Sequence, residues 1–310
     1  MTNSIDTLIT QLQERHNFYL QQILSEQDFP SQILYEAMNY ALFPGGKRIR
    51  PLLIYLVGDI LKISPACLDI LAAAIELIHT YSLIHDDLPA MDNDDFRRGK
   101  PSCHKAFPEG LAILAGDALQ TYAIQILLQK LPLHLSPQQV IEIAQILCES
   151  SGIGGMISGQ CFDLYPQYQK NSLDISKSLE NLKHTHDLKT GKLILACINM
   201  SIAAQKAPPA FEAVTALRHY AKQLGFTYQI QDDYLDKYAH HDVLGKKRSS
   251  DISNQKNTYA TYYSHDALHS LITEHYQSTL DALNYFGDKG EPLRQFTGLL
   301  LKRDKITQQL

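Results

Sequence analysis

Residues 69–85 form a stretch that is apolar on nearly every face, and no other feature limits the fold of this chain as strongly. A helix that is apolar all round is buried, either in the core of a large protein or within a membrane. A membrane span needs about 18 to 20 apolar residues free of charge, whereas this stretch contains Glu76 and no other window reaches that length. We therefore expect a central helix, a candidate dimer element, and no stable membrane insertion.

Helical spacing also dominates the rest of the sequence. Apolar residues recur at i, i+3, i+4 and i+7, whereas alternating Val, Ile and Thr runs are few and Asn-Gly turns between apolar stretches are missing. There is no fixed repeat, low-complexity tract or linker, so the sequence predicts an all-α fold in a single domain, residues 1–310. Helices are expected at 5–24, between Ser31 and Pro44, and at 52–61, 69–85, 111–130, 136–149, 172–184, 189–204, 209–238 and 259–285.

Composition excludes several classes of partner and site. The formal net charge is −5 and no continuous run of Lys and Arg occurs, which argues against a nucleic-acid partner. The five cysteines are an odd number without a CxxC pair, which argues against a disulfide framework or a zinc site and fits a reducing cytoplasm. Asp6 and Glu14 interrupt the apolar residues of the amino terminus, unlike a signal peptide. We expect a cytoplasmic protein.

Two clusters of three aspartates lie about 145 residues apart: Asp86, Asp87 and Asp92, then Asp232, Asp233 and Asp236. Like charges that close repel each other, so each cluster needs a cation, and ligands that are all oxygen favour Mg²⁺. Basic residues follow the clusters along the chain: Arg97, Arg98, Lys189, Lys246 and Lys256. Carboxylates, Mg²⁺ and a ring of Arg and Lys are what binding and ionising a diphosphate requires.

Each cluster also has an ordinary structural interpretation. Asp232 and Asp236 are four residues apart, so one ion can bridge them on a helix, with Gln229 on the same stripe; an isolated motif of this kind is more often a solvated acidic face. Asp86 and Asp87 fall in the last turn of a helix that Pro89 ends near Leu88, where the helix dipole disfavours anions. Surface ion pairing is the alternative there, and two such clusters in one chain make it improbable.

Other polar residues and glycines are placed by their spacing. Glu76, His79 and Asp86 recur near one stripe, so they are expected to point together into a polar cavity. The Glu-x-x-His pair that two of them form lacks the second copy that a di-iron bundle needs. Gly155 and Gly159 do not follow dinucleotide-binding spacing and are expected to allow close helix contact or leave room in a cavity.

Several blocks over residues 35–259 resemble those of the trans-isoprenyl diphosphate synthases, and within them the bacterial enzymes that make farnesyl diphosphate. The blocks occur in family order: GGKRIRP, AAAIELIHTYSLIHDDLPAMDNDDFRRGKPSCH, LAGDALQ, GMISGQCFDL, KTGKL and QIQDDYLD. The resemblance implies helices around a deep central cavity, a homodimer, and two Asp motifs that face each other across the cavity mouth. Its partners would be small isoprenyl diphosphates.

The resemblance also implies roles for single residues. Three Mg²⁺ ions per active site, holding the diphosphate of the allylic substrate, would be bound by Asp86, Asp87, Asp92, Asp232, Asp233 and Asp236. The same diphosphate would be contacted by Arg97, Lys189 and Lys246. The diphosphate of isopentenyl diphosphate would bind without metal to Lys47, Arg50, His79 and Arg98. Thr190 and Gln229 would line the reacting carbons. The residues expected to take part in catalysis are Lys189, Thr190, Gln229, Asp86, Asp87 and Asp232.

Product length should depend on the depth of the cavity below the first motif. A helix rises about 1.5 Å per residue, so Ser82 and Tyr81 lie about 6 to 7.5 Å below Asp86, where a growing tail would arrive. In the family an aromatic residue at the position of Tyr81 forms a floor, and the DDxxxxD spacing is that of bacterial farnesyl enzymes. We expect a fifteen-carbon product, made from dimethylallyl diphosphate through geranyl diphosphate, beneath a mobile loop at residues 239–257.

Three alternatives remain open at this point. A synthase of geranylgeranyl diphosphate would share every motif and differ at the floor. A terpene cyclase shares the aspartate motif but lacks the paired Lys47, Arg50 and Arg98 that a second diphosphate needs. A non-catalytic prenyltransferase subunit would keep the fold, yet such subunits usually lose motif aspartates, and both sets are intact here.

Overall fold

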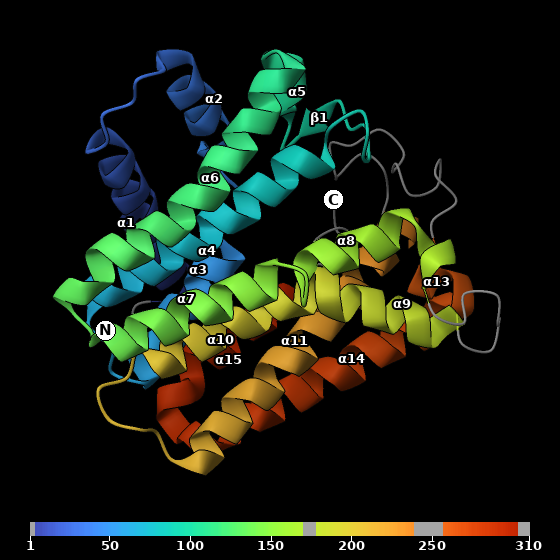
Figure 1. The fold of residues 1–310 in the computed structure, drawn as a ribbon. Helices are drawn as coiled ribbons and strands as arrows, with labels where there is room; N and C mark the ends of the chain where they lie inside the picture. The colour runs from blue at the N-terminus through green and yellow to red at the C-terminus, as the bar shows by residue number, and fades with distance from the viewer. Residues whose placement is uncertain (1–3, 170–177, 239–256, 303–310) are drawn as a thin grey trace. The chain divides into compact units, whose positions relative to one another are not determined.

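A computed structural model describes residues 4–169, 178–238 and 257–302, which are mainly helical (Figure 1). The chain divides into two compact units. Unit 1 comprises Met1–Gln145 with Ala203–Lys206, and unit 2 comprises Ile146–Ile202 with Ala207–Leu310. The all-α prediction is confirmed, and the single domain over residues 1–310 stays a prediction.

Unit 1 is built around the predicted central helix, α4 (Pro65–Asp86). Pro65 occupies its first turn, where a missing backbone N–H costs nothing. The most apolar part of α4 is 83% buried, chiefly against α6 and α3, and its role as a dimer element stays a prediction. The helices of this unit are α1 (Ile5–Ser25), α2 (Gln32–Leu42), α3 (Ile49–Ile60), α4, α5 (Cys103–Ala106), α6 (Glu109–Lys130), η1 (Leu131–Leu133) and the first part of α7 (Pro137–Ser151).

Local signals set most helix boundaries in unit 1. The Ser31 side chain accepts a hydrogen bond from the N–H of Leu34 and so caps α2 as predicted. The helix predicted at 52–61 begins earlier, at Ile49, with Pro51 in its first turn. A two-stranded hairpin that the sequence did not indicate joins β1 (Phe96–Arg97) to β2 (Lys100–Pro101). Its turn residues Arg98 and Gly99 both have positive φ angles, as a type I′ hairpin turn requires.

Unit 2 is organised around α11 (Phe211–Tyr238), which packs most extensively against α14 (His265–Asp281) (Figure 1). A π-helical turn, η4 (Asp187–Gly191), contacts α8, α9 and α11. The other elements are the end of α7, α8 (Met156–Leu164), η2 (Pro166–Tyr168), α9 (Ser178–His186), α10 (Lys192–Ala203), α13 (Tyr259–Tyr262), η5 (Ala282–Gly290) and α15 (Glu291–Leu301).

The single helix predicted at 259–285 is wrong. Tyr263 is extended, and the Ser264 side chain accepts from the N–H of Ala267, so the chain stops α13 and caps α14 as a new helix. Gly287 then leaves helical geometry inside η5, and α15 follows. Ser264 and Gly287 are ordinary helix-boundary residues, and the long apolar periodicity concealed them.

Three helical segments of the described residues are long and apolar enough to cross a membrane by length and composition. They are Pro65–Asp86, Glu109–Leu133 and Pro137–Leu164, and 83%, 44% and 33% of their most apolar windows are buried. The apolar surface of Pro65–Asp86 is therefore mostly buried in the core of unit 1.

Candidate functional site

The first aspartate cluster lies at the carboxyl end of α4 in unit 1. Asp86 is the last residue of the helix, and its carbonyl oxygen accepts the N–H of Asp92 at 2.9 Å. The chain therefore turns back after Pro89 and brings the two ends of the motif together. Asp86 and Asp92 are partly exposed, which leaves them accessible to a cation.

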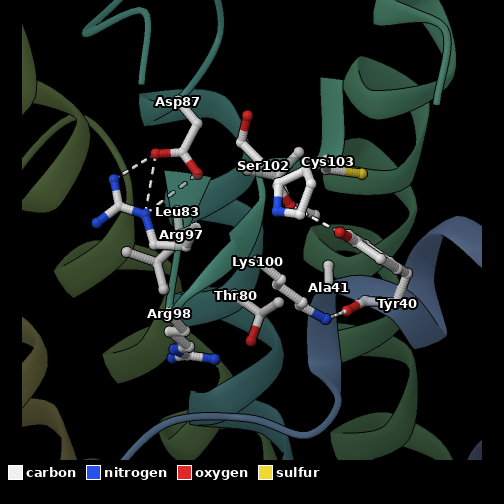
Figure 2. Close-up of a pocket in the computed structure, with 12 residues that line it drawn as sticks. Tyr40, Ala41, Thr80, Leu83, Asp87, Arg97, Arg98, Lys100, Ser102 and Cys103 are labelled. Carbon is white, nitrogen blue, oxygen red and sulfur yellow. Dashed lines mark hydrogen bonds and ion pairs between the residues drawn. The ribbon is translucent and has the colours of Figure 1, made fainter. Parts of the chain in front are cut away.

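Asp87 is placed differently from its two neighbours. It is only 2% exposed, and Arg97 of β1 donates to it through Nε at 2.9 and 3.1 Å and through Nη2, as Figure 2 shows. Arg97 Nη2 also reaches Asp94 Oδ2 at 3.2 Å. Burial raises the pKa of Asp87, and the contacts with Arg97 oppose that rise. Asp87 therefore holds the guanidinium of Arg97 beside the cluster.

A second group of basic side chains gathers near the Gly45–Gly46 loop, also in unit 1. Arg50 Nη1 lies 3.3 Å from His79 Nε2, and the Arg98 guanidinium lies so close to Gly46 that a Cβ there would come within 2.8 Å of Arg98 Nε. Burial, followed by Arg50 and Arg98, lowers the pKa of His79, so the ring is neutral and able to accept from Arg50. Such a concentration of cationic groups suits an anion.

The pocket of Figure 2 adjoins both groups. Arg97 and Arg98 line it, and the Thr80 hydroxyl, buried on its wall, has no hydrogen-bond partner among the described residues. Lys100 donates to the carbonyls of Phe43, at 2.6 Å, and Tyr40. The other lining residues are Tyr40, Ala41, Leu83, Ile84, Asp87, Pro101, Ser102 and Cys103.

The three residues of the predicted polar stripe on α4 have different surroundings. Glu76 is buried and its Oε1 lies 2.5 Å from Nη1 of Arg48, whereas His79 faces Arg50 and Asp86 ends the helix. The expectation that Glu76 shares a cavity with the other two stays a prediction. Periodicity places a polar residue on a helix face but does not identify a partner 28 residues away.

The two residues expected to limit product length differ in burial. Tyr81 is buried, and its ring meets that of His85 edge-on with the centroids 5.6 Å apart. Its hydroxyl has no hydrogen-bond partner within the described part of the chain. Burial raises the pKa of Tyr81 to about 12. Ser82 is partly exposed, and its hydroxyl donates to the carbonyl of His79. Tyr81 thus fills interior volume and Ser82 does not.

The second aspartate cluster lies near the carboxyl end of α11 in unit 2. Asp232 and Asp236 are partly exposed and one helical turn apart, as the spacing predicted. Asp233 is 6% exposed and accepts hydrogen bonds from the N–H of Tyr259 at 2.8 Å and from Gln229 Nε2 at 3.3 Å. The outer pair therefore faces outward while Asp233 holds α13 against α11.

Lys189 and Thr190 project from η4. Lys189 Nζ donates to Asp163 Oδ2 at 2.7 Å, and Thr190 donates to Gln229 Oε1 at 3.0 Å. A Cβ on Gly159 would overlap the backbone nitrogen of Lys189, which confirms the close helix contact expected at that glycine. Isolated π-helical turns occur frequently at functional sites. Asp163 and the π-turn are features that sequence reasoning missed.

His186 lies behind these residues. It is buried against the ring of Tyr259, with centroids 5.4 Å apart, and burial lowers its pKa to about 4. His184 is exposed. Lys246 and the predicted loop at 239–257 fall almost wholly outside the described residues.

The carboxylates fit one mode of Mg²⁺ binding, in which the protein supplies only a few of the ligands. Among the described residues, no three acidic, His or Cys side chains lie close enough to form a metal cage. Mg²⁺ usually retains several waters and binds one or two carboxylates together with substrate phosphates. Partly exposed pairs such as Asp86 with Asp92, and Asp232 with Asp236, are suited to an ion that arrives with a diphosphate.

Comparison with known proteins gives consistent relatives. The farnesyl diphosphate synthase of Haemophilus influenzae is 39% identical over 275 residues, covering 89% of this chain and 90% of the relative. The geranylgeranyl diphosphate synthase of Cyanophora paradoxa is 33% identical over 275 residues, covering 87% and 88%.

Solved structures agree with these relatives. A geranyltransferase from Legionella pneumophila matches with a TM-score of 0.88 and 46% identity, covering 97% of this chain and 98% of that one. A geranyltransferase from Helicobacter pylori, solved with magnesium and isoprenyl diphosphate, matches with a TM-score of 0.79 and 28% identity, covering 97% and 98%. The family to which these enzymes belong is Mg²⁺-dependent.

The model of one protein family, described as polyprenyl synthetase, matches residues 31–289, which is most of the chain. This chain belongs to the polyprenyl synthetase family.

Proposed function

We propose that this protein is a Mg²⁺-dependent farnesyl diphosphate synthase. It condenses isopentenyl diphosphate head to tail with dimethylallyl diphosphate and then with geranyl diphosphate, giving (2E,6E)-farnesyl diphosphate. The observation that carries the proposal is the separation, within unit 1, of a basic group around Arg50, His79 and Arg98 from the acidic pair Asp86 and Asp92. Two diphosphates require one site of each kind.

In this proposal the allylic diphosphate is bound by the aspartate clusters and nearby cations. Bound Mg²⁺, three ions per active site, would neutralise negative charge on the leaving diphosphate. Asp86, Asp92, Asp232 and Asp236 supply carboxylates, and the cations are Arg97, Lys189 and Lys246. Asp87 and Asp233, also expected as ligands, are the most buried of the six aspartates, and their contacts favour an orienting role.

The ion pair between Lys189 and Asp163 supports a defined position for the ammonium group. Stabilising developing negative charge with groups already in place is the largest contribution in many enzymes. The amide and hydroxyl of Gln229 and Thr190, held together at 3.0 Å, turn their dipoles to the allylic cation. That cation forms when the allylic C–O bond breaks and its electron pair leaves with the diphosphate. The double bond of isopentenyl diphosphate then attacks the cation and forms the new C–C bond, and the proton lost from the isopentenyl unit passes to the departed diphosphate.

Isopentenyl diphosphate binds without metal in this proposal. Lys47, Arg50, His79 and Arg98 hold its diphosphate, and the desolvation that lowers the pKa of both His79 and Arg98 supports strong electrostatic contacts there. A neutral His79 donates or accepts one hydrogen bond without adding further positive charge to a site that already contains three cations.

Product length is set by Tyr81 in this proposal. The experiment combines purified protein, Mg²⁺, isopentenyl diphosphate and geranyl diphosphate, followed by dephosphorylation, gas chromatography and mass spectrometry. We expect farnesol, and we expect Tyr81→Ala to shift the product to geranylgeraniol. Ser82→Ala is the matched control and should leave chain length unchanged. Geranylgeraniol from the unaltered protein would indicate a longer-chain synthase, and no product at all would indicate a non-catalytic subunit.

The proposal includes a cytoplasmic homodimer without nucleic-acid partners. Three large apolar side chains of α6, Ile113, Leu114 and Leu128, are exposed. A second copy of the chain would bury them. Light scattering should give twice the mass of the chain, and Leu114→Asp should give the monomer mass; a monomer before substitution would contradict the dimer.

A further inference from the structure

Arg48 is buried beside two predicted substrate-binding residues, Lys47 and Arg50. Its backbone has a φ of 54°, in the left-handed region. Lys47 before it is exposed and Arg50 after it is partly exposed, whereas the side chain of Arg48 is 1% exposed. Of the three basic side chains at the end of the loop and the start of α3, only that of Arg48 therefore points inward.

Every nitrogen group of the Arg48 side chain has a partner on a different element. Nη1 donates to Glu76 of α4 at 2.5 Å, Nη2 to the carbonyl of Leu42 at the end of α2 at 2.7 Å, and Nε to Asn17 of α1 at 3.1 Å. Gln13, also on α1, donates to the carbonyl of Lys47 at 2.9 Å. Three helices thus fix the loop at the residues that precede Arg50.

Stability alone does not explain the ion pair between Arg48 and Glu76. Both side chains are 1% exposed, and desolvating two charges offsets most of their attraction, so an apolar pair is often as stable. Glu76 also lies one helical turn from His79, and its charge favours the charged form of Arg98, whose pKa burial lowers. The pair therefore adjoins the basic group on several sides.

We propose that Arg48 and Glu76 are positioning residues that hold Lys47, Arg50 and Arg98 in the arrangement that binds isopentenyl diphosphate. This inference rests on the proposed function. In this proposal Arg48 does not contact the diphosphate. It holds the loop in place through its hydrogen bonds to α1, α2 and α4. Glycine is required at position 45, where φ is 85° and a Cβ would overlap the Arg48 guanidinium.

The test compares Arg48→Met and Glu76→Gln with the unaltered protein. Calorimetry measures binding of isopentenyl diphosphate alone, and steady-state kinetics give KM for isopentenyl and geranyl diphosphates separately. We expect Kd and KM for isopentenyl diphosphate to rise at least about tenfold, because small displacements of binding groups are costly. KM for geranyl diphosphate should change less than about twofold.

Arg15→Met is the matched control. It removes a bidentate ion pair to Asp69, at 2.7 Å for each hydrogen bond, which also ends on α4 but about two helical turns before Glu76. It should leave both KM values unchanged. If Arg48→Met does not fold, Asn17→Ala removes the partner of Arg48 Nε without removing the charge of Arg48, and it should raise KM for isopentenyl diphosphate selectively.

Two negative results have different meanings. Folded variants that bind isopentenyl diphosphate as the unaltered protein does would overturn the positioning role and leave the proposed function intact. An unaltered protein that neither binds isopentenyl diphosphate nor forms product would overturn the proposed function itself.

Discussion

The two aspartate clusters have similar sequences but lie in different secondary structure. In unit 1 the cluster spans a helix end and the turn after it, whereas in unit 2 it lies within a continuous helix. The middle aspartate of each, Asp87 or Asp233, is nearly buried at 2% and 6% exposure. The outer aspartates of both clusters are partly exposed.

The buried aspartates are stabilised by different chemistry. Asp87 meets the full charge of Arg97, whereas the hydrogen bonds that Asp233 accepts from the N–H of Tyr259 and the amide of Gln229 come from neutral donors. A charged partner compensates more of a carboxylate's desolvation than a neutral one. The comparison separates two environments within one motif: outer residues that are partly exposed and an inner residue that is buried against its partners.

The largest expected effect follows from removing an outer aspartate. Asp232→Ala should lower kcat with geranyl diphosphate by on the order of 10² to 10³, because charge stabilisation at the leaving group is lost. Asp86→Ala should act similarly. The free energy of unfolding, measured in urea, should change little for either. A kcat within about threefold of the unaltered value would remove that residue from the proposed metal site.

The inner aspartates should differ in stability. Asp87→Ala leaves Arg97 without its main buried partner and should lower the free energy of unfolding by about 3 kcal/mol. Asp233→Ala leaves the buried N–H of Tyr259 unpaired and should lower it by about 1 to 2 kcal/mol. Urea denaturation with circular dichroism measures both. An equal or reversed order would contradict the distinction between charged and neutral partners.

Acid should weaken unit 2 through His186. The pKa of His186 is about 4 in the folded protein and about 6.5 when unfolded, so the unfolded chain gains the proton first as pH falls. The contribution of the neutral His186 ring to the free energy of unfolding is fully present above pH 6.5. It is lost between pH 6.5 and 4, by up to about 3 kcal/mol. His186→Gln should show a shallower loss between pH 7 and 5. An unchanged slope would assign the acid sensitivity to other groups.

The smallest effect should come from the exposed ion pair of Lys105 and Asp95. Its atoms are 2.9 Å apart, but both side chains are well exposed. Lys105→Ala should change the free energy of unfolding by less than about 1 kcal/mol and leave kcat unchanged. A loss as large as that of Asp87→Ala would show that burial does not govern these pairs.

Features encoded in nearby residues were predictable from the sequence. The buried helix α4, the Ser31 cap and the one-turn spacing of Asp232 and Asp236 each depend on residues within a turn or two. Helical periodicity and capping preferences are sufficient for such features.

Features that depend on distant partners were not predictable. The pairing of Arg48 with Glu76 and of Lys189 with Asp163 joins residues 28 and 26 positions apart. The hairpin that carries Arg98 uses Arg-Gly where Asn-Gly is the usual signal. Tertiary contacts select these arrangements, and a local pattern contains no record of them.

The direction in which Lys189 projects depends on the number of residues in the π-helical turn at 187–191. A π-helical turn holds one more residue than the α-helical turn that flanks it. Deleting a single residue there would restore regular winding and rotate Lys189 by about 100° relative to α10. The Lys189 position is therefore more sensitive to a deletion in this turn than to a conservative substitution within it.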